Sequence, residues 1–469
     1  MAPLAASLNP YVLGPADARS PCATANAPAI TAKMSPSTNS PSPHSRTGSD
    51  DTGTGNEDHC QRDAGKLYYK TSGGAGVESY DVLVVGAGPS GSAAAKYAAN
   101  AGCRTLLIEK RTEIGTPVRC GEGIAKGWLA EIGVPPSPKF IAHEVQGARV
   151  FAPDGTCLTI DASLAGNEVG YTLERDMFDR YLAAEAARAG AEIRIRTSAT
   201  SLLKEDGKVV GAQCEHMGRT YDVRAKLVIG ADGFESQVGR WAGLATHLRA
   251  ADIDACLEYT MVGVQGDARF DDFYIGSCAP GGYLWVFWKG EDIANVGLGV
   301  NLSRLRDKAE VKAYLDRFLR EHPDLGRGSV LSEIAGGVSV SPPLERTVTY
   351  GCVLVGDAAR MIDPLTGGGI LNGCVAGRYA GEVAGEALAA DDFSAAFLGR
   401  YERRWRDRFE EGLYRNYMLK EKLRKMDDAM INRLVRAVAD VVPTGLNAPA
   451  ILGALRERHP DVLQELELF

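Results

Sequence analysis

The order of hydrophobic and polar positions predicts an α/β fold that begins at Tyr80. Residues 80–85 form a short β-branched run that stops at a glycine, as expected of a buried parallel strand. Residues 89–101 are rich in alanine and end before a glycine, which predicts a helix. Residues 104–108 predict a second strand that ends at Glu109, so the three segments together form a βαβ unit.

The pattern becomes antiparallel between residues 252 and 300. Tyr283, Trp285 and Phe287 alternate with other residues, 289–292 predicts a turn, and the chain returns through 293–300. The other predicted elements are a helix over 171–189 after a short extended segment, a strand over 192–196, a hairpin of 209–215 with 220–223, buried strands over 225–230 and 352–355, and charged helices from Phe393 onward.

Residues 1–79 show neither a helical nor a strand period and are rich in Ala, Ser, Thr, Pro and Gly. Such a segment buries too little apolar surface to offset its ordering entropy, so we expect it to be disordered. It has no charged start followed by an apolar core, which argues against a secretory signal. The part before Ser49 loosely resembles an organelle transit peptide, and a start codon misassigned upstream of Met34 explains it equally well.

The charge, the hydropathy and the cysteine pattern argue against nucleic-acid binding, membrane spans and metal sites. The formal charge of −8 argues against a general nucleic-acid binder. No segment approaches the roughly 18 uninterrupted apolar residues that span a bilayer, so we expect a cytoplasmic protein whose membrane contact, if it has one, is peripheral. The ten cysteines form no CxxC pair and no Cys/His cluster with zinc spacing, so no metal site is expected.

The first chemical motif is a glycine-rich turn between the first strand and helix. Gly86 permits the tight turn, Gly88 lets the backbone approach a pyrophosphate, and Gly91 allows close helix–strand packing. The free N–H groups at the helix start, including that of Ser90, favour an anion. Glu109 follows the second strand, where its carboxylate can accept hydrogen bonds from ribose hydroxyls. Within a complete βαβ unit, this pattern predicts a dinucleotide.

Two further motifs place an aspartate just past a buried strand. Asp232 follows residues 227–230, and Asp357 follows residues 353–356. Each carboxylate can bind a ribityl or ribose hydroxyl. The loop from Gly367 to Ile370 opens a helix, so its N–H groups can face the pyrimidine carbonyls of a flavin and stabilise negative charge on the reduced ring. The three motifs together predict FAD.

At this point the chain resembles the FAD flavoproteins of the aromatic-hydroxylase type, and more narrowly the geranylgeranyl reductase family, which includes the archaeal digeranylgeranylglycerophospholipid reductases. The narrower resemblance rests on residues 109–115, on Pro117-Val-Arg-Cys-Gly-Glu-Gly123 and on Tyr283-Leu-Trp-Val-Phe-Trp-Lys289. It covers about residues 80–385. This chain departs from the family pattern at Trp288, where the family has proline, and that departure puts the local shape of a lipid tunnel in doubt.

The resemblance implies a set of cofactor contacts. Ser90 and Glu109 would serve the pyrophosphate and the adenosine ribose, Arg175 would neutralise phosphate, and the backbone at Ala199 would border the adenine. The flavin side would be completed by Cys120, Gly121, Gly123, Asp357, Gly369 and Ile370.

We therefore expect a Rossmann-type FAD-binding domain with an inserted antiparallel-sheet substrate domain and a C-terminal helical region. The expected boundaries are 80–145, 171–245 and 345–390 for the FAD-binding domain, 146–170 and 246–344 for the substrate domain, and 391–469 for the helical region.

The expected reaction is saturation of double bonds in geranylgeranyl chains, most simply those of membrane ether-lipid precursors. An isolated alkene accepts hydride poorly, so a donor must protonate one carbon while the flavin delivers hydride to the other. Cys120 is a candidate proton relay, although a small residue packed against the ring explains it nearly as well. Tyr283, Trp285 and Phe287 either line an apolar tunnel or form the ordinary inner face of a sheet.

Several alternatives stay open. Geranylgeranyl diphosphate or a chlorophyll side chain is another substrate within the family, and an FAD monooxygenase is the main alternative reaction. No second dinucleotide motif follows a strand, so electrons would come from ferredoxin, from a deazaflavin or other flavin-type carrier, or from transiently docked NAD(P)H. Residues 400–436 hold 12 basic and 7 acidic residues, which fit either anionic lipid headgroups or a solvated face of ion pairs.

Overall fold

The structure is a computed structural model that describes residues 78–161, 170–307, 309–441 and 448–468. The disordered extension predicted over residues 1–79, with both explanations of its origin, lies outside the described residues except for its last two residues, which form part of a strand. Strand β1 (Glu78–Val85) begins two residues earlier than predicted, because Glu78 and Ser79 also pair with strand β11 (Arg219–Gly230).

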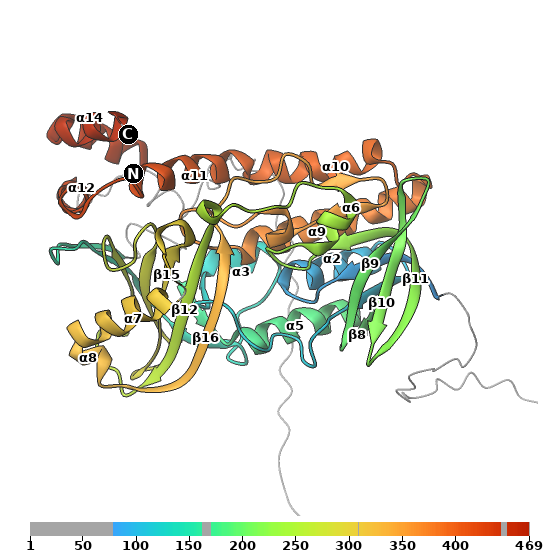
Figure 1. The fold of residues 1–469 in the computed structure, drawn as a ribbon, viewed down its shortest axis with the longest axis horizontal. Helices are drawn as coiled ribbons and strands as arrows, with labels where there is room; N and C mark the ends of the chain where they lie inside the picture. The colour runs from blue at the N-terminus through green and yellow to red at the C-terminus, as the bar shows by residue number, and fades with distance from the viewer. Residues whose placement is uncertain (1–77, 162–169, 308, 442–447, 469) are drawn as a thin grey trace, which may run out of the picture. The chain divides into compact units, whose positions relative to one another are not determined.

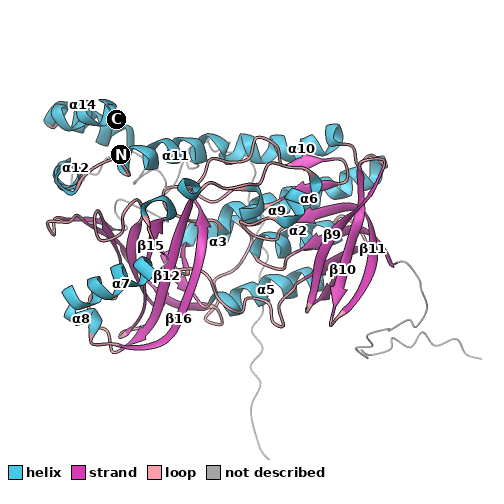
Figure 2. Ribbon diagram, in the orientation of Figure 1, coloured by secondary structure: helices cyan, strands magenta, loops and turns pink. Residues whose placement is uncertain are grey.

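An eight-stranded sheet has the Rossmann-type arrangement that the first motif predicts (Figure 2). Its main strands lie in the order β17 (Val348–Thr349), β18 (Cys352–Leu354), β11, β1, β2 (Thr105–Ile108) and β8 (Glu192–Arg194). All pairings from β18 to β8 are parallel. The hairpin of β9 (Thr197–Glu205) and β10 (Lys208–His216) extends from β11.

Strand β11 corrects one prediction. The sequence pattern indicates separate strands over 220–223 and 225–230, but the structure has one continuous strand of 12 residues. Its first half pairs antiparallel with β10 and its second half pairs parallel with β1. The strand changes its pairing partner without a break. The pattern of hydrophobic residues therefore changes along one continuous strand, and this change was interpreted as a boundary between two strands.

Four helices cover this sheet: α2 (Pro89–Asn100), α5 (Arg175–Arg188), α9 (Ile370–Ala390) and α10 (Ala395–Trp405) (Figure 1). Helix α9 carries glycines four residues apart, which places them on one face. A Cβ on Gly377 would lie 2.3 Å from the carbonyl oxygen of Ser90, and one on Gly381 would lie 2.6 Å from the amide nitrogen of Ala98. These glycines therefore let α9 approach the backbone of α2, which brings the first turns of both helices to the same place.

The second large sheet contains the predicted antiparallel segment. Its seven strands lie in the order β16 (Ser329–Ser339), β12 (Ile253–Val262), β15 (Ile293–Asn301), β14 (Tyr283–Trp288), β13 (Phe270–Ile275), β5 (Gly147–Phe151) and β6 (Cys157–Asp161). All pairs are antiparallel except β5 with β13. The predicted turn at 289–292 joins β14 to β15.

The two faces of this sheet differ. Leu284, Val286 and Trp288 point into a core that is closed by α7 (Ala309–Glu321) and α8 (Pro323–Gly326). Because side chains alternate along a strand, Tyr283, Trp285 and Phe287 occupy the opposite face. Trp288, the departure from the family pattern, therefore lies on the face away from these three aromatic residues.

A three-stranded sheet, of β3 (Gly123–Ala125), β7 (Gly170–Leu173) and β4 (Ile141–Glu144), precedes α5 in the fold. The C-terminal region is helical, as predicted: α10 is followed by α11 (Glu411–Leu423), α12 (Asp428–Val441), α13 (Ala448–Arg458) and α14 (Pro460–Leu468). Apolar residues of α12 pack on β5 and β6. None of the described helices is both long and apolar enough to cross a bilayer.

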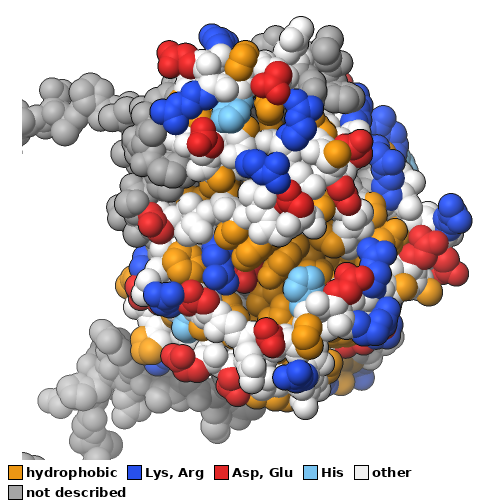
Figure 3. Space-filling model, turned by 90° about the vertical axis from the view of Figure 1, so that its left-hand side faces the viewer, with side chains coloured by type: hydrophobic (Ala, Val, Ile, Leu, Met, Phe, Trp, Pro, Cys, Tyr) orange, Lys and Arg blue, Asp and Glu red, His pale blue; other side chains and the backbone are white. Residues whose placement is uncertain are grey.

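Many basic residues of the C-terminal region form ion pairs. Arg404 contacts Glu382 and Glu386, Arg408 contacts Glu131, and Arg436 contacts Asp154. Figure 3 likewise shows positive and negative side chains interspersed on the face it views, around a hollow where hydrophobic side chains gather. These contacts favour the interpretation of the charge excess as a face of ion pairs.

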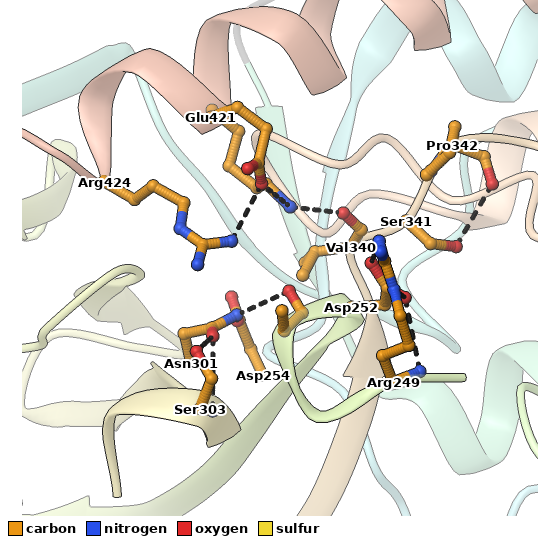
Figure 4. Close-up of polar contacts among 12 residues, drawn as sticks. Arg249, Asp252, Asp254, Asn301, Ser303, Val340, Ser341, Pro342, Glu421 and Arg424 are labelled. Carbon is orange, nitrogen blue, oxygen red and sulfur yellow. Dashed lines mark hydrogen bonds and ion pairs between the residues drawn. The ribbon is translucent and has the colours of Figure 1, made fainter.

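Two crossings of the chain between the large sheets lie beside α11 (Figure 4). The chain passes into β12 through residues 249–253, where Arg249 pairs with Asp252 at 2.8 Å. It returns after β16, where Lys420 of α11 donates to the carbonyl oxygen of Val340 at 2.6 Å. Helix α11 thus contacts the connection that runs from the seven-stranded sheet back to the eight-stranded sheet.

Candidate active site

The glycine-rich turn leaves space for a ligand. A Cβ on Gly86 would lie 2.4 Å from the carbonyl oxygen of Ala231, and one on Gly91 would lie 1.9 Å from the carbonyl oxygen of Gly86. Both glycines are therefore required by the fold itself. A Cβ on Gly88 would meet nothing within 4 Å. The turn is tight against the protein on one side and open at the position expected to face a pyrophosphate.

Glu109 lies at the open side of this turn. Its carboxylate accepts hydrogen bonds from the backbone N–H groups of Ala87 and Arg111, each at 3.0 Å. Strand β9 begins beside it, because the N–H of Thr197 donates to the carbonyl oxygen of Glu109 at 2.8 Å. Ala199 lies two residues further along β9, so the structure places it on the strand that follows this contact.

Ser90 joins the first motif to the third. A Cβ on Gly356, the residue before Asp357, would lie 2.7 Å from Ser90 Oγ, and one on Gly373 of α9 would lie 3.3 Å from Ser90 Cβ. The start of α2 therefore lies against the turn that carries Asp357 and against the start of α9. Two motifs that are more than 250 residues apart form one surface.

Asp357, Gly369 and Ile370 meet at the first turn of α9. A Cβ on Gly369 would lie 3.2 Å from Asp357 Oδ1, and Ile370 begins the helix. Burial raises the pKa of Asp357, while Arg175 opposes that rise. Apart from its own backbone N–H, no described residue donates a hydrogen bond to this carboxylate, so it can accept one from a ligand hydroxyl.

Asp232 has a different environment. Its two oxygens accept hydrogen bonds from Ser236 Oγ at 3.2 Å and from the N–H of Val238 at 2.9 Å. These contacts hold the start of α6 (Gln237–Ala242). The structure thus gives this carboxylate partners within its own loop, which the sequence analysis did not foresee.

The cysteine loop, residues 120–123, packs on the aromatic strand of the other sheet. A Cβ on Gly121 would lie 3.0 Å from the Phe287 ring and 3.2 Å from Trp285 Nε1, and one on Gly123 would lie 3.3 Å from Phe287. Both glycines allow the loop to lie flat against these rings. Burial raises the pKa of the Cys120 thiol, while Arg175 lowers it, so the sulfur is held mainly as a thiol at neutral pH.

Glu122 anchors this loop and was missed by the sequence analysis. Its carboxylate accepts hydrogen bonds from Lys289 Nζ at 2.5 Å, Asn295 Nδ2 at 2.7 Å and the backbone N–H of Arg175 at 2.8 Å. Its backbone has φ 75°, an unusual value for a residue other than glycine, and these three bonds compensate for it. The sequence did hold one indication of this role, because Glu122 is a charged residue between two glycines.

Arg175 occupies the first turn of α5 beside the cysteine loop. Its guanidinium donates to both oxygens of Asp179, at 3.0 and 3.2 Å. Burial alone would lower the pKa of Arg175, but Asp179 and Cys120 raise it overall. The guanidinium is a fixed positive charge near Cys120 and Asp357, with an acidic partner already present in the protein.

The aromatic face closes the site from the side of the seven-stranded sheet. The Tyr283 hydroxyl donates to the carbonyl oxygen of Thr366, just before the Gly367–Ile370 loop. The ring centroids of Tyr283 and Trp285 are 5.8 Å apart, and those of Trp285 and Phe287 are 6.3 Å apart. One strand therefore contacts both loops that are expected to border the flavin ring.

Comparisons with known proteins show which families this chain resembles. A family model described as the geranylgeranyl reductase catalytic domain matches residues 252–338, and one described as FAD dependent oxidoreductase matches residues 81–277. The chain is 50% identical over 393 residues to the digeranylgeranylglycerophospholipid reductase of Thermoplasma volcanium, covering 83% of this chain and 99% of the relative. It is 45% identical over 387 residues to that of Methanothrix thermoacetophila, covering 82% and 98%.

Solved structures show the same relationship. The crystal structure of a geranylgeranyl bacteriochlorophyll reductase-like protein from Thermoplasma acidophilum is 49% identical, has a TM-score of 0.79, and covers 84% of this chain and 99% of its own. A flavin-dependent brominase shares only the fold, at 18% identity and a TM-score of 0.59 over 83% of this chain and 93% of its own.

This chain belongs to the geranylgeranyl reductase family of FAD-dependent oxidoreductases. The predicted fold class is confirmed, and FAD is the cofactor. The residues present fit that group: an open position at Gly88, an acid at the end of β2, the Asp357 carboxylate, to which no described side chain donates a hydrogen bond, and a glycine-rich helix start at Gly369.

Proposed function

We propose that this enzyme saturates the double bonds of geranylgeranyl chains, with a digeranylgeranylglycerophospholipid as the substrate. One observation carries the proposal beyond the family assignment. The cysteine loop lies directly on Trp285 and Phe287, so the loop expected to border the flavin ring and the aromatic face share one site. An apolar chain bound along that face would place its double bonds beside the ring edge.

The cofactor contacts that we propose for this chain are those that the resemblance to the family implies. The N–H groups at the start of α2, around Gly88 and Ser90, would hold the pyrophosphate, and Glu109 would accept the adenosine ribose hydroxyls, with the backbone of Ala199 beside the adenine. The remaining contacts would come from Cys120, Gly121, Gly123, Arg175, Asp232, Asp357, Gly369 and Ile370.

When bound and reduced, FAD supplies a hydride. The protein must supply the matching proton and keep the alkene in place. The Cys120 thiol is neutral at neutral pH and lies in the loop against the aromatic face, so it can give a proton to one alkene carbon. Tyr283, Trp285 and Phe287 form the apolar wall that orients the chain and excludes water.

Reduction of each double bond consumes two electrons, so the enzyme needs an electron donor. Ferredoxin, a deazaflavin or a reduced nicotinamide fits the absence of a second dinucleotide motif from the sequence. A lipid substrate also implies that the enzyme collects it at a membrane surface. We propose peripheral contact of a cytoplasmic enzyme, although the ion pairs of the C-terminal helices argue against those basic residues as the contact surface.

The test is a single turnover without oxygen. Enzyme reduced chemically and mixed with digeranylgeranyl phospholipid should reoxidise its flavin, and the lipid should gain two hydrogens per double bond. Geranylgeranyl diphosphate serves as the competing substrate in a parallel reaction. A lipid product that had gained oxygen in air, with no hydrogenated product under anaerobic conditions, would replace this proposal by a monooxygenase.

A further inference from the structure

Glu258 is a buried carboxyl group on the aromatic side of the seven-stranded sheet. It is 3% exposed and accepts a hydrogen bond from Trp285 Nε1 at 2.7 Å. The two residues come from β12 and β14, with β15 between them. The contact is possible because Gly297 of β15 has no side chain: a Cβ there would lie 2.5 Å from the Trp285 ring and 2.9 Å from Glu258 Cβ.

The same indole connects Glu258 to the cysteine loop. Trp285 Nε1 lies 3.2 Å from the position that a Cβ on Gly121 would take, next to Cys120. When Glu258 is ionised, its negative charge contributes to the raised pKa of the Cys120 thiol. Trp285 therefore lies between the buried acid and the loop that carries the thiol.

Glu258 is poised to hold a proton. Burial raises the pKa of its carboxyl group to about 8, a nearby Glu122 adds to the rise, and Trp285 and Lys289 oppose it. Asp254 and Cys256 share its strand, and Cys120 faces it from the loop. Trp285 Nε1 contacts only one carboxyl oxygen, and the other has no hydrogen-bond partner among the described residues. The group can therefore give and take a proton at neutral pH.

We propose that Glu258 resupplies the proton of the Cys120 thiol each time a double bond is saturated. The inference rests on the proposed function. The thiol would give its proton to one alkene carbon, and reduced FAD, when bound, would supply the hydride for the other, so that two new C–H bonds replace the π bond. The Cys120 thiolate then takes the carboxyl proton of Glu258, and the Glu258 carboxylate takes up one proton from the solvent, so each double bond consumes one solvent proton and one hydride. Glu258 acts through Cys120 and is a positioning residue in this scheme.

The experiment compares Glu258→Gln with Asp271→Asn. Asp271 is a matched control, because it lies in the same sheet and burial also raises its pKa to about 8. Its carboxyl group accepts a hydrogen bond from the backbone N–H of Trp288 and not from a residue of the aromatic face beside the cysteine loop. Two measurements are made on each FAD-loaded protein. Infrared titration follows the carbonyl band of each protonated carboxyl group, and anaerobic stopped flow follows flavin reoxidation by digeranylgeranyl phospholipid on either side of pH 8.

Each variant should lose its own infrared band. Only Glu258→Gln should slow reoxidation, by about 10²-fold, and remove the fall in rate above pH 8. In the double variant with Cys120→Ser, the rate should equal that of Cys120→Ser alone, since both residues serve one proton path. A normal rate and pH profile for Glu258→Gln, or multiplied losses in the double variant, would overturn the proposal. Failure of wild-type enzyme to react with the lipid would instead overturn the proposed function, while the infrared titration would still report the state of Glu258.

Discussion

Lys289 Nζ lies 2.5 Å from Glu122 Oε2, and this ion pair joins the seven-stranded sheet to the cysteine loop. The side chains are 9% and 4% exposed, so the contact is almost fully withdrawn from water. Lys289 also contacts Glu174, just before α5. A single cation at the end of the aromatic strand thus fixes the position of the loop on which Cys120 lies.

Loss of this cation should destabilise the protein. In Lys289→Met, the Glu122 carboxylate stays buried with only dipolar partners, and we expect the free energy of unfolding to fall by about 3–5 kcal/mol. Lys126→Met is the matched control, since it removes an exposed pair with Glu144 and should cost less than about 1 kcal/mol. Urea unfolding measures both. Equal losses in the two variants would contradict the role given to Lys289.

Gly297 is expected to be required for the Trp285–Glu258 contact. In Gly297→Ala, the new Cβ would force the indole to move, and overpacking of this kind costs about 1–3 kcal/mol. Gly290→Ala changes the turn of the same hairpin, where the nearest atom is 4.0 Å away, and should fold normally. Gly297→Ala alone should lose lipid reduction activity and stability, the latter measured by urea unfolding. An active Gly297→Ala enzyme of normal stability would show that the contact is dispensable.

Two glycines of the first motif should respond differently to alanine. Gly88→Ala places a Cβ in open space, so the FAD-free protein should keep its stability while FAD affinity falls. Gly91→Ala places a Cβ 1.9 Å from a backbone oxygen and should lower both the stability of the FAD-free protein and its affinity for FAD. Thermal unfolding without FAD and titration with FAD separate the two effects. Unchanged FAD affinity in Gly88→Ala would show that the pyrophosphate does not lie beside Gly88.

Glu258 should make stability depend on pH. Its pKa in the folded protein is about 8, whereas an unfolded glutamate has a pKa of about 4.3, so the folded state binds the extra proton between these values. Stability therefore falls as pH rises from the lower value to the upper one, and then levels off. Because Gln does not titrate, Glu258→Gln should become progressively more stable than wild type over this range. A pH-independent difference in unfolding free energy would refute the assignment.

The local motifs were predictable because each is a short run with its own geometry. Residues 80–109 indicated a strand, a tight turn, a helix and an acid, and the structure contains them. The alternation of Tyr283, Trp285 and Phe287 likewise indicated one face of a strand. The fold class followed from these patterns.

Contacts that depend on strand order were not predictable. Glu258 and Trp285 meet only because β15 lies between their strands and has a glycine at the crossing point. Lys289 looked like a turn residue, and its carboxylate partner is 167 residues away. The partners of Asp232 within the protein were not predictable either, because its loop folds back so that Ser236 and Val238 donate to it. One sequence carries no information on such pairings before the sheet order is known.

The most direct test of the whole account is mass spectrometry of digeranylgeranyl phospholipid after reaction with the chemically reduced enzyme in deuterium oxide under anaerobic conditions. The account predicts that each saturated double bond gains two deuterium atoms, one through the flavin and one from the Cys120 thiol, since both groups exchange with the solvent, and that the lipid gains no oxygen. Unchanged lipid beside a fully reduced flavin would contradict it.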